Sequence, residues 1–234
     1  MASVILVRHS RSTANTAGVL AGQAPGISLD ETGFTQAQGL TARIGDALIS
    51  RVISSPLQRC IETISPWHEK YGTTEIEIDN NFIESDYGSW TGKKLSELAK
   101  EPLWKSVQKS PSTVTFPEGE SFQAMFKRVS NGLDSIIDKL AENDNVIVVS
   151  HGDIIKLAIA KILGLPIDNF QKLVIDPASI SIVKVENLDT KDNEEHSRRT
   201  ALISMNESGT PLSKLLESKE LAGLGGGKGD GGGA

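Results

Sequence analysis

The stretch that decides the fold is Ser3-Val4-Ile5-Leu6-Val7-Arg8-His9-Ser10. Its four consecutive apolar residues are mostly β-branched, and an arginine and a histidine follow them at once. A short apolar run of this kind is typical of a strand that is buried on both faces. A second stretch of the same kind is Asn145-Val146-Ile147-Val148-Val149-Ser150-His151-Gly152. We therefore predict buried strands over 3–7 and 145–149, each with a histidine close behind its end.

The rest of the chain alternates between further strand and helix patterns. We predict a third strand over 51–54 and two late strands over 180–185 and 200–205, with a solvated hairpin loop at 187–199. Apolar residues spaced three or four apart predict helices over 30–48, from Pro56 onward with a kink or break at Pro66, over 121–140 and over 154–163. Strands that alternate with helices predict a layered α/β domain.

The composition is that of an ordinary globular protein. Of 234 residues, 38% are hydrophobic and 23% are charged, which argues against wholesale disorder and against a fibrous repeat. A formal net charge of −6 argues against a nucleic-acid-binding surface, although a small cationic pocket is compatible with it. The single cysteine, Cys60, allows no internal disulfide and fits a reducing compartment. The longest apolar runs have four residues, whereas a membrane span needs ~20 and a secretory signal ~7–15. We therefore expect a soluble cytoplasmic protein with no nucleic-acid or membrane partner.

Glycine is distributed unevenly along the chain. Eight of the 22 glycines lie in residues 222–234. We therefore expect residues 1–206 to form the folded domain and residues 207–234 to form a C-terminal tail, which is Gly-rich and disordered from residue 222.

Basic and imidazole groups follow three of the predicted strands. Arg8 and His9 come directly after the first strand, His151 follows the strand over 145–149, and Arg59 lies just beyond the strand over 51–54. In an open α/β sheet, ligands gather at the carboxyl ends of the strands. One histidine at such a place is usually only a polar residue leaving a buried strand. Two of them at equivalent strand ends, with arginines beside them, indicate a site for an anion.

In their order along the chain, these residues resemble the histidine phosphatase superfamily, in the branch that contains cofactor-dependent phosphoglycerate mutase. That family begins with a strand, Arg-His-Gly, a variable residue and Ser or Thr, which is similar to residues 4–12. Further matching pieces follow in the family's order, at Asn15 and at residues 29–33, 54–63, 82–92, 117–121, 148–152 and 205–206. The likeness covers about residues 3–206. It implies a phosphoglycerate mutase-like α/β fold with three layers, in which a mostly parallel central sheet has helices on both faces, and a catalytic domain over 1–206.

The resemblance assigns five residues to phosphoryl transfer. His9 would attack phosphorus and become a phosphohistidine, with its other ring nitrogen held by a backbone carbonyl. Arg8 and Arg59 would bind non-bridging oxygens as planar donor forks, and His151, if protonated, would add a third cationic donor. Glu84 would be the general acid and would then activate water. Burial raises the pKa of such a carboxyl and neighbouring cations lower it, and the sequence leaves that balance open.

Further residues are predicted to contact the substrate. Asn15 would donate a hydrogen bond to a phosphate oxygen, and Ser10 would donate through its backbone N–H or its hydroxyl. Ser10 stands where the family has glycine, a costly exchange if the position needs a positive φ. Four residues either line the substrate side of the pocket or belong to a solvated loop: Arg11, Ser12, Gly22 and Gln23. No His, Cys and carboxylate cluster has metal-ligand spacing, so we expect no metal and no cofactor.

The predicted function is that of a metal-independent phosphomonoester hydrolase acting on a small phosphorylated metabolite. A phosphoglycerate mutase would use the same five groups, but those mutases carry a sizeable insertion between the acid and the second histidine. Here only residues 85–150 separate Glu84 from His151, which is short for such an insertion. A third hypothesis is a phosphate-ligand-binding module that has lost turnover through Ser10. The sequence identifies neither the phosphate ester nor the oligomeric state.

Overall fold

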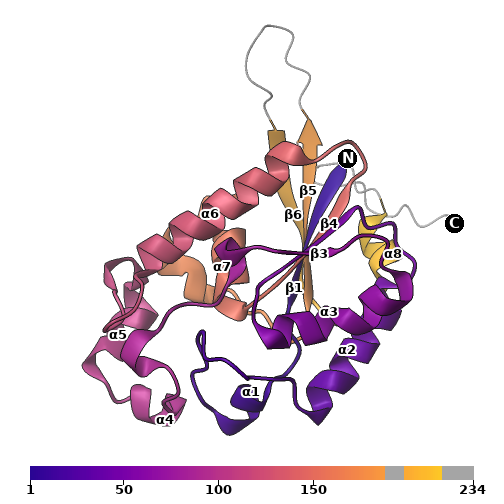
Figure 1. Ribbon diagram of the computed structural model, residues 1–234. Helices are drawn as coiled ribbons and strands as arrows, with labels where there is room; N and C mark the ends of the chain where they lie inside the picture. The colour runs from indigo at the N-terminus through magenta and orange to yellow at the C-terminus, as the bar shows by residue number, and fades with distance from the viewer. Residues whose placement is uncertain (188–197, 218–234) are drawn as a thin grey trace, which may run out of the picture.

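The computed structural model describes residues 1–187 and 198–217 (Figure 1). The strands in this part of the chain are β1 Ala2–Arg8, β2 Arg51–Ser54, β3 Ile76–Ile78, β4 Asn145–Ser150, β5 Ile180–Asn187 and β6 Arg198–Glu207. They form one sheet in the order β3-β2-β4-β1-β5-β6. The first four strands run parallel, whereas β5 is antiparallel to β1 and β6 is antiparallel to β5. The predicted α/β fold with a mostly parallel sheet is confirmed.

Helices cover both faces of the sheet, as predicted. The α-helices of the described residues are α1 Thr13–Ala17, α2 Glu31–Ile44, α3 Gln58–Tyr71, α4 Leu95–Leu98, α5 Pro102–Lys109, α6 Phe122–Lys139, α7 Gly152–Ile162 and α8 Leu212–Leu216. The 3-10 helices are η1 Asn80–Phe82, η2 Gly88–Trp90, η3 Pro111–Thr113 and η4 Ile167–Lys172. Helices α6 and α7 pack on one face of the sheet, and α2, α3 and α8 pack on the other (Figure 1).

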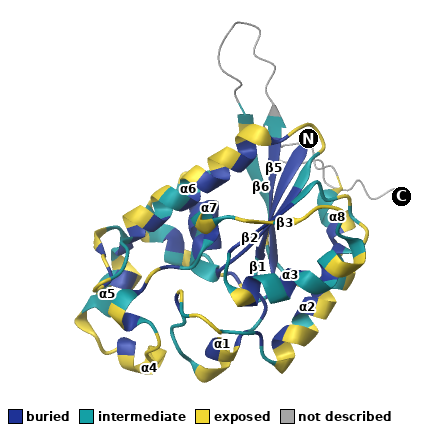
Figure 2. Cartoon of the chain, in the orientation of Figure 1, coloured by how far each residue is buried: buried dark blue, intermediate teal, exposed yellow. Residues whose placement is uncertain are grey.

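Side chains that alternate along β1 divide the core between these two layers. Val4 and Leu6 point into the layer under α6 and α7, whereas Ile5 and Val7 point into the layer under α2 and α3. All four are at most 1% exposed. A strand that is covered on both faces has to be apolar at every position, which is why its apolar residues are continuous rather than alternating. Figure 2 shows the central strands β1 and β4 as mostly buried and the outward faces of the helices as exposed, whereas the edge strands β3 and β6 are intermediate or exposed.

The pairing of β1 with β4 brings the two predicted histidines together. The strands are parallel, with Arg8 opposite Ser150. The backbone N–H of His9 donates to the Ser150 carbonyl at 2.9 Å. Because parallel strands end at the same edge of a sheet, His9 and His151 emerge side by side although they are far apart in sequence. Strand β2 pairs with β4 on its other side, so Arg59 on the following helix reaches the same edge.

Several helix boundaries differ from the sequence-based expectation. Helix α2 ends at Gly45, which has φ +58°, and not at residue 48, so Leu48 is 88% exposed. Helix α3 begins two residues after Pro56 and continues through Pro66, so of the expected kink or break the break is wrong. Packing on both sides of this proline, by the buried Ile64 and Trp67, offsets the backbone hydrogen bond that proline removes. The short elements α1, α4, α5 and β3 were not predicted, because a segment of so few residues shows no clear hydrophobic periodicity.

Packing continues beyond the expected domain limit at residue 206. Strand β6 runs to Glu207, and Leu212 of α8 is fully buried in the layer that also holds α2 and α3. The expected loop at 187–199 is shortened by β5 and β6, and its residues 188–197 lie outside the described residues, as does the Gly-rich end from residue 222. Over residues 1–187 and 198–217, no helix is both long and apolar enough to cross a membrane.

Candidate active site

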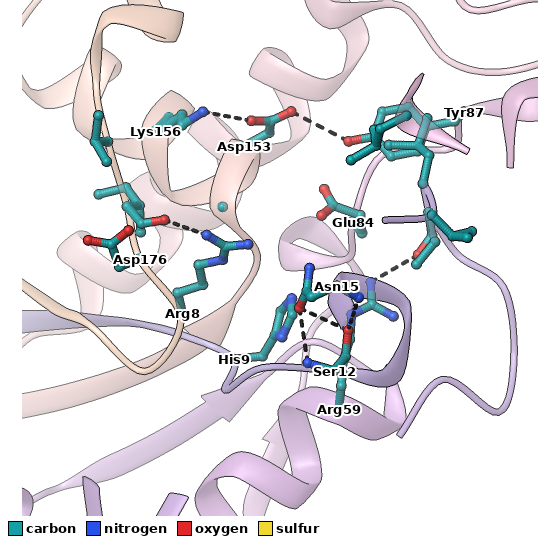
Figure 3. Close-up of a pocket in the computed structure, with 18 of the residues that line it drawn as sticks. Arg8, His9, Ser12, Asn15, Arg59, Glu84, Tyr87, Asp153, Lys156 and Asp176 are labelled. Carbon is teal, nitrogen blue, oxygen red and sulfur yellow. Dashed lines mark hydrogen bonds and ion pairs between the residues drawn. The ribbon is translucent and has the colours of Figure 1, made fainter. Parts of the chain in front are cut away.

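A cavity of about 420 Å³ lies at the carboxyl ends of β1 and β4 (Figure 3). Four of the five residues predicted to act on phosphate line it: Arg8, His9, Arg59 and Glu84. The fifth, His151, is fully buried directly behind them, with its ring centroid 5.2 Å from that of His9. The structure thus brings all five together, from three strand ends and one loop.

His9 is held in the orientation that a nucleophile needs. Its Nδ1 lies 2.7 Å from the Ser10 carbonyl oxygen, so Nδ1 carries the proton and Nε2 carries the lone pair. The expected backbone-carbonyl partner is therefore present. Burial lowers the pKa of His9 well below its usual value, and the charges of Arg59 and Arg8 lower it further. The imidazole is neutral at physiological pH and therefore nucleophilic.

His151 is neutral as well. Its Nε2 lies 2.8 Å from Ser55 Oγ, and its Nδ1 lies 3.2 Å from Arg59 Nη2. An arginine can only donate, so Nδ1 is the acceptor and the proton is on Nε2. Burial lowers the pKa of His151 well below its usual value, followed by the charges of Arg59, His9 and Arg8. The structure therefore favours a neutral His151 ring over the protonated ring that would add a third cationic donor.

Both arginines keep unused donors inside the protein. Arg59 is 2% exposed, and its Nη2 donates to the Gly22 carbonyl at 2.9 Å. Its Nη1 is buried and has no hydrogen-bond partner among the described residues. Arg8 donates from Nη1 to the Ile175 carbonyl, while its buried Nε has no partner in that part of the chain. Both guanidinium groups line the cavity, so their positive charge faces any anion that binds there.

Glu84 has the protonation behaviour of a general acid. Its Oε2 lies 3.8 Å from His151 Nδ1, and its side chain is mostly buried. Burial raises the pKa of Glu84 to about 7, the charge of Asp153 adds to the effect, and Arg59 and Arg8 oppose it. The balance that the sequence left open is thus decided by burial. Near neutral pH a large fraction of Glu84 is protonated and able to donate.

The loop that carries Glu84 is held by side chains rather than by strand pairing. Arg128 of α6 donates from Nη1 to the carbonyls of Asn81 and Ile83 at 2.9 and 2.8 Å, and from Nη2 to that of Glu84 at 3.2 Å. The same guanidinium binds both carboxylate oxygens of Glu120, at 3.1 and 2.7 Å. Glu120 Oε1 in turn accepts from the Asp86 backbone N–H at 3.0 Å. The acid is therefore positioned from the long helix α6.

One side of the cavity carries polar residues that sequence reasoning missed. Asp153, Lys156, Gln171 and Asp176 line it. Lys156 Nζ lies 3.1 Å from Asp153 Oδ1, and the Tyr87 hydroxyl donates to Asp153 Oδ2 at 3.4 Å. The signal for Asp153 and Lys156 was their place on the first turns of the helix that follows His151. Nothing in the sequence marked Asp176, which the chain brings back from a distant loop.

The residues predicted for the substrate side divide into two groups. Asn15, Ser12 and Gly22 line the cavity. Arg11 and Gln23 do not, because other partners hold their side chains. Arg11 Nε pairs with Asp30 Oδ2 at 2.7 Å outside the cavity, and Gln23 Nε2 donates to the Glu84 carbonyl at 2.9 Å. Gln23 thus braces the loop of the acid.

Ser10 fits its position without backbone strain. It is not among the described residues with a left-handed backbone, so the site does not need glycine there. Ser10 is fully buried but does not line the cavity, and its backbone N–H donates to Thr63 Oγ1 at 2.8 Å. The expected donation from Ser10 to substrate is therefore not supported. The hydroxyl has no partner among the described residues.

Together these groups offer a neutral nucleophilic imidazole, two guanidinium groups with free donors and a protonated carboxyl around one cavity. This set can bind a dianion, attack it and protonate the oxygen that leaves. Over residues 1–187 and 198–217, no group of three or more His, Cys, Asp and Glu side chains is arranged to hold a metal ion.

The model of a known family matches most of the chain. It is described as the histidine phosphatase superfamily (branch 1), and residues 4–191 match it. A protein named probable phosphoglycerate mutase GpmB, from Erwinia tasmaniensis, is 32% identical over 78% of this chain and 85% of its own length. A protein named phosphoserine phosphatase 1, from Hydrogenobacter thermophilus, is 29% identical over 88% of this chain and 92% of its own.

Longer proteins and solved structures also match. A protein of Mycobacterium tuberculosis named bifunctional protein Rv2228c is 32% identical over 77% of this chain, but the chain spans only 50% of that relative's length. The fold is similar to that of mycobacterial glucosyl-3-phosphoglycerate phosphatase Rv2419c, solved in complex with VO3. The TM-score is 0.76 and the identity 23%, over 88% of this chain and 99% of the other.

Proposed function

This chain belongs to the histidine phosphatase superfamily, branch 1, and on that premise we propose that it hydrolyses small phosphate monoesters through a phosphohistidine on His9, without a metal. The observation that carries this proposal is the fixed tautomer of His9. The 2.7 Å contact from Nδ1 to the Ser10 carbonyl turns the Nε2 lone pair toward a cavity that also holds two guanidinium groups and Glu84. The relative from Hydrogenobacter thermophilus is also named a phosphatase.

In the first step, His9 Nε2 attacks phosphorus and forms a P–N bond. The bond from phosphorus to the ester oxygen breaks, and that oxygen takes the proton of Glu84 and leaves as an alcohol. Arg8 and Arg59, which both line the cavity, bind the non-bridging oxygens. Oriented cationic donors of this kind contribute ~3 kcal/mol each to transition-state stabilisation.

In the second step, the Glu84 carboxylate takes a proton from a water molecule that attacks phosphorus. The P–N bond breaks, inorganic phosphate leaves, and His9 and protonated Glu84 are restored. A mutase would instead return the phosphoryl group to a second hydroxyl of a bound substrate. Residues 85–150 form only η2, α4, α5, η3, α6 and β4 with the turns between them, which is short for the insertion of such a mutase and favours access of water.

The test is a panel of phosphomonoesters assayed for phosphate release in the presence of a chelator. The same protein is assayed with 3-phosphoglycerate and its bisphosphate primer. We expect phosphate release that persists in chelator and is lost in His9→Ala. Isomerisation without phosphate release would contradict the proposed phosphatase activity and would support a phosphoglycerate mutase, the activity for which some relatives are named. Binding without turnover, restored to turnover by Ser10→Gly, would support the binding-module hypothesis.

A further inference from the structure

The cavity extends well beyond the groups that bind phosphate. One side of the cavity is formed by α7 and by the segment from η4 to β5, and we call this side the outer wall. Its residues are Asp153, Lys156, Gln171, Val174 and Asp176. Figure 3 draws Lys156 and Asp176 on the opposite side of the cavity from Asn15 and Arg59. When a phosphoryl group lies between the arginines and His9, the alcohol part of the ester occupies the rest of the cavity, and the outer wall forms one side of that space.

The one ammonium group of the outer wall is already paired. Lys156 Nζ lies 3.1 Å from Asp153 Oδ1 and donates to Gln171 Oε1 at 3.2 Å. It is therefore a poor partner for a second anionic group on a substrate, because such a group would have to compete with the Asp153 carboxylate. The wall as a whole carries two carboxylates against one ammonium.

Asp176 is a carboxylate that the fold holds in place. Its backbone N–H donates to Asn206 Oδ1 at 2.6 Å, and Asn206 Nδ2 donates to Asp176 Oδ2 at 2.8 Å. Asn206 has a left-handed backbone, with φ +55°. On either side of Asp176 the segment is tied to β1, because the Ile175 carbonyl accepts from Arg8 and the Ala178 N–H donates to the Arg8 carbonyl at 3.2 Å. The other carboxylate oxygen, Oδ1, accepts no hydrogen bond from the described residues.

We infer that the outer wall selects the alcohol part of the substrate, and that this alcohol is not anionic and presents a hydroxyl or ammonium donor to Asp176. The inference rests on the proposed phosphatase activity, whose substrate class it narrows. A second phosphate or a carboxylate would meet the charges of Asp176 and Asp153 at close range, whereas a hydroxyl or ammonium group would satisfy Asp176. Exposed Val174 and Leu95, 59% and 40% accessible, offer apolar contact to the carbon chain of such an alcohol.

The test uses two esters that differ in one group. Glycerol 3-phosphate carries a hydroxymethyl group where 3-phosphoglycerate carries a carboxylate. We expect kcat/KM for phosphate release to favour glycerol 3-phosphate by about tenfold or more. In Asp176→Asn the ratio of the two kcat/KM values should fall toward one, because the substitution removes the repulsion and keeps an oxygen for Asn206. Asp46→Asn, which removes the same charge from outside the cavity, should keep the ratio of the unsubstituted protein.

The same preference can be measured without turnover. Calorimetric titration of the His9→Ala protein with each ester should give a lower Kd for glycerol 3-phosphate, and Asp176→Asn in that background should reduce the difference. A ratio near one in the unsubstituted protein, or equal losses for both esters in Asp176→Asn, overturns the inference and makes Asp176 a counter-charge for Arg8 alone. If neither ester is hydrolysed but the ratio of Kd values holds, the proposed hydrolysis fails and the selectivity of the outer wall stands.

Discussion

The wall that carries His9 and the wall that carries Glu84 face the same cavity but are held in different ways. His9 continues β1, and its N–H donates to the Ser150 carbonyl as part of the pairing with β4. Glu84 lies in an irregular segment, and Arg128 binds three of that segment's carbonyls from α6. The proposed nucleophile is therefore fixed by the sheet itself, whereas the proposed acid is held by side chains, with Arg128 making three of the contacts and Gln23 one more. Loss of a side chain can loosen the second wall without unfolding the protein.

The largest expected effect on phosphate release comes from a substitution in the wall that carries His9, which we call the strand-held wall. His9→Ala should lower phosphate release by about 10³-fold or more, because His9 is the only histidine among the described residues that line the cavity. Quenching a reaction with labelled phenyl phosphate in alkali, where a P–N bond survives, should trap label on the unsubstituted protein and not on the variant. His68→Ala, whose ring contacts the Thr74 carbonyl outside the cavity, is the matched control. Label retained in His9→Ala would place the nucleophile elsewhere.

At the acid wall, the effect should depend on the leaving group. Glu84→Gln should lower kcat for an alkyl phosphate by about 10²–10⁴-fold, because an alkoxide leaves poorly without a proton. For p-nitrophenyl phosphate, whose leaving group is a stabilised anion, the loss in the first step should be much smaller. The measurement is the ratio of single-turnover rates for the two esters. Equal losses for both would mean that Glu84 does not act as the acid.

Substitution of Arg128 tests most directly whether the two walls are held in different ways, because Arg128 binds three carbonyls of the segment that carries Glu84. In Arg128→Lys the five-donor fork that holds Asn81, Ile83 and Glu84 is lost, and we expect a fall of about 10–100-fold for the alkyl ester, as for other small misplacements of a catalytic group. The p-nitrophenyl ester should be affected less, as in Glu84→Gln.

Arg51→Lys is the control for this substitution. Arg51 makes a similar two-pronged contact with Glu77, but on partly exposed strands away from the cavity. The activity of the Arg51→Lys protein toward both esters should stay unchanged. If Arg128→Lys lowers both esters equally together with Tm, Arg128 supports the fold in general and not the acid.

The pH profile of alkyl ester hydrolysis should show the titration of Glu84 alone. Glu84 works in its protonated form and its pKa is about 7, so alkyl ester hydrolysis should be half lost near pH 7 and should fall further as pH rises. The groups that face Glu84 are Asp153, whose charge raises this pKa, Arg59 and Arg8, which lower it, and neutral His151. His9 stays neutral well below pH 6.5, so the nucleophile sets no limit in this range. A profile that is flat from pH 6 to 9 would contradict the assignment of Glu84.

The smallest effect is expected from a change that touches neither wall. Removal of residues 222–234 should leave kcat/KM unchanged, because the residues that line the cavity end at Asp176 and the packed core reaches no further than α8 among the described residues. The measurement is phenyl phosphate hydrolysis by the shortened and the full chain. A loss of more than about twofold would assign the Gly-rich end a part in the site or in stability.

Much of the strand-held wall could be predicted from sequence, for a physical reason. Continuous apolar residues mark a strand that is buried on both faces, and parallel strands end at one edge, so His9 and His151 could be placed together from local patterns. Arg59 could be placed there as well, because it follows the strand over 51–54, whereas Glu84 came only from the resemblance to a family. Helix ends were predicted less well, since Leu48 fits the helical period but lies beyond the glycine that ends α2.

The sequence by itself determined the layered α/β fold and the placement of His9, Arg8 and Arg59 at one edge of the sheet, because each rests on a short-range pattern or a short motif. Only the tertiary structure decided how these groups behave. It turned Arg11 away to Asp30, made His151 neutral through burial beside Arg59, and raised the pKa of Glu84 to about 7. It also brought Arg128 and Asp176 to the site from distant segments. Desolvation and charge–charge interaction depend on distances in space, and no local pattern in a chain specifies those distances.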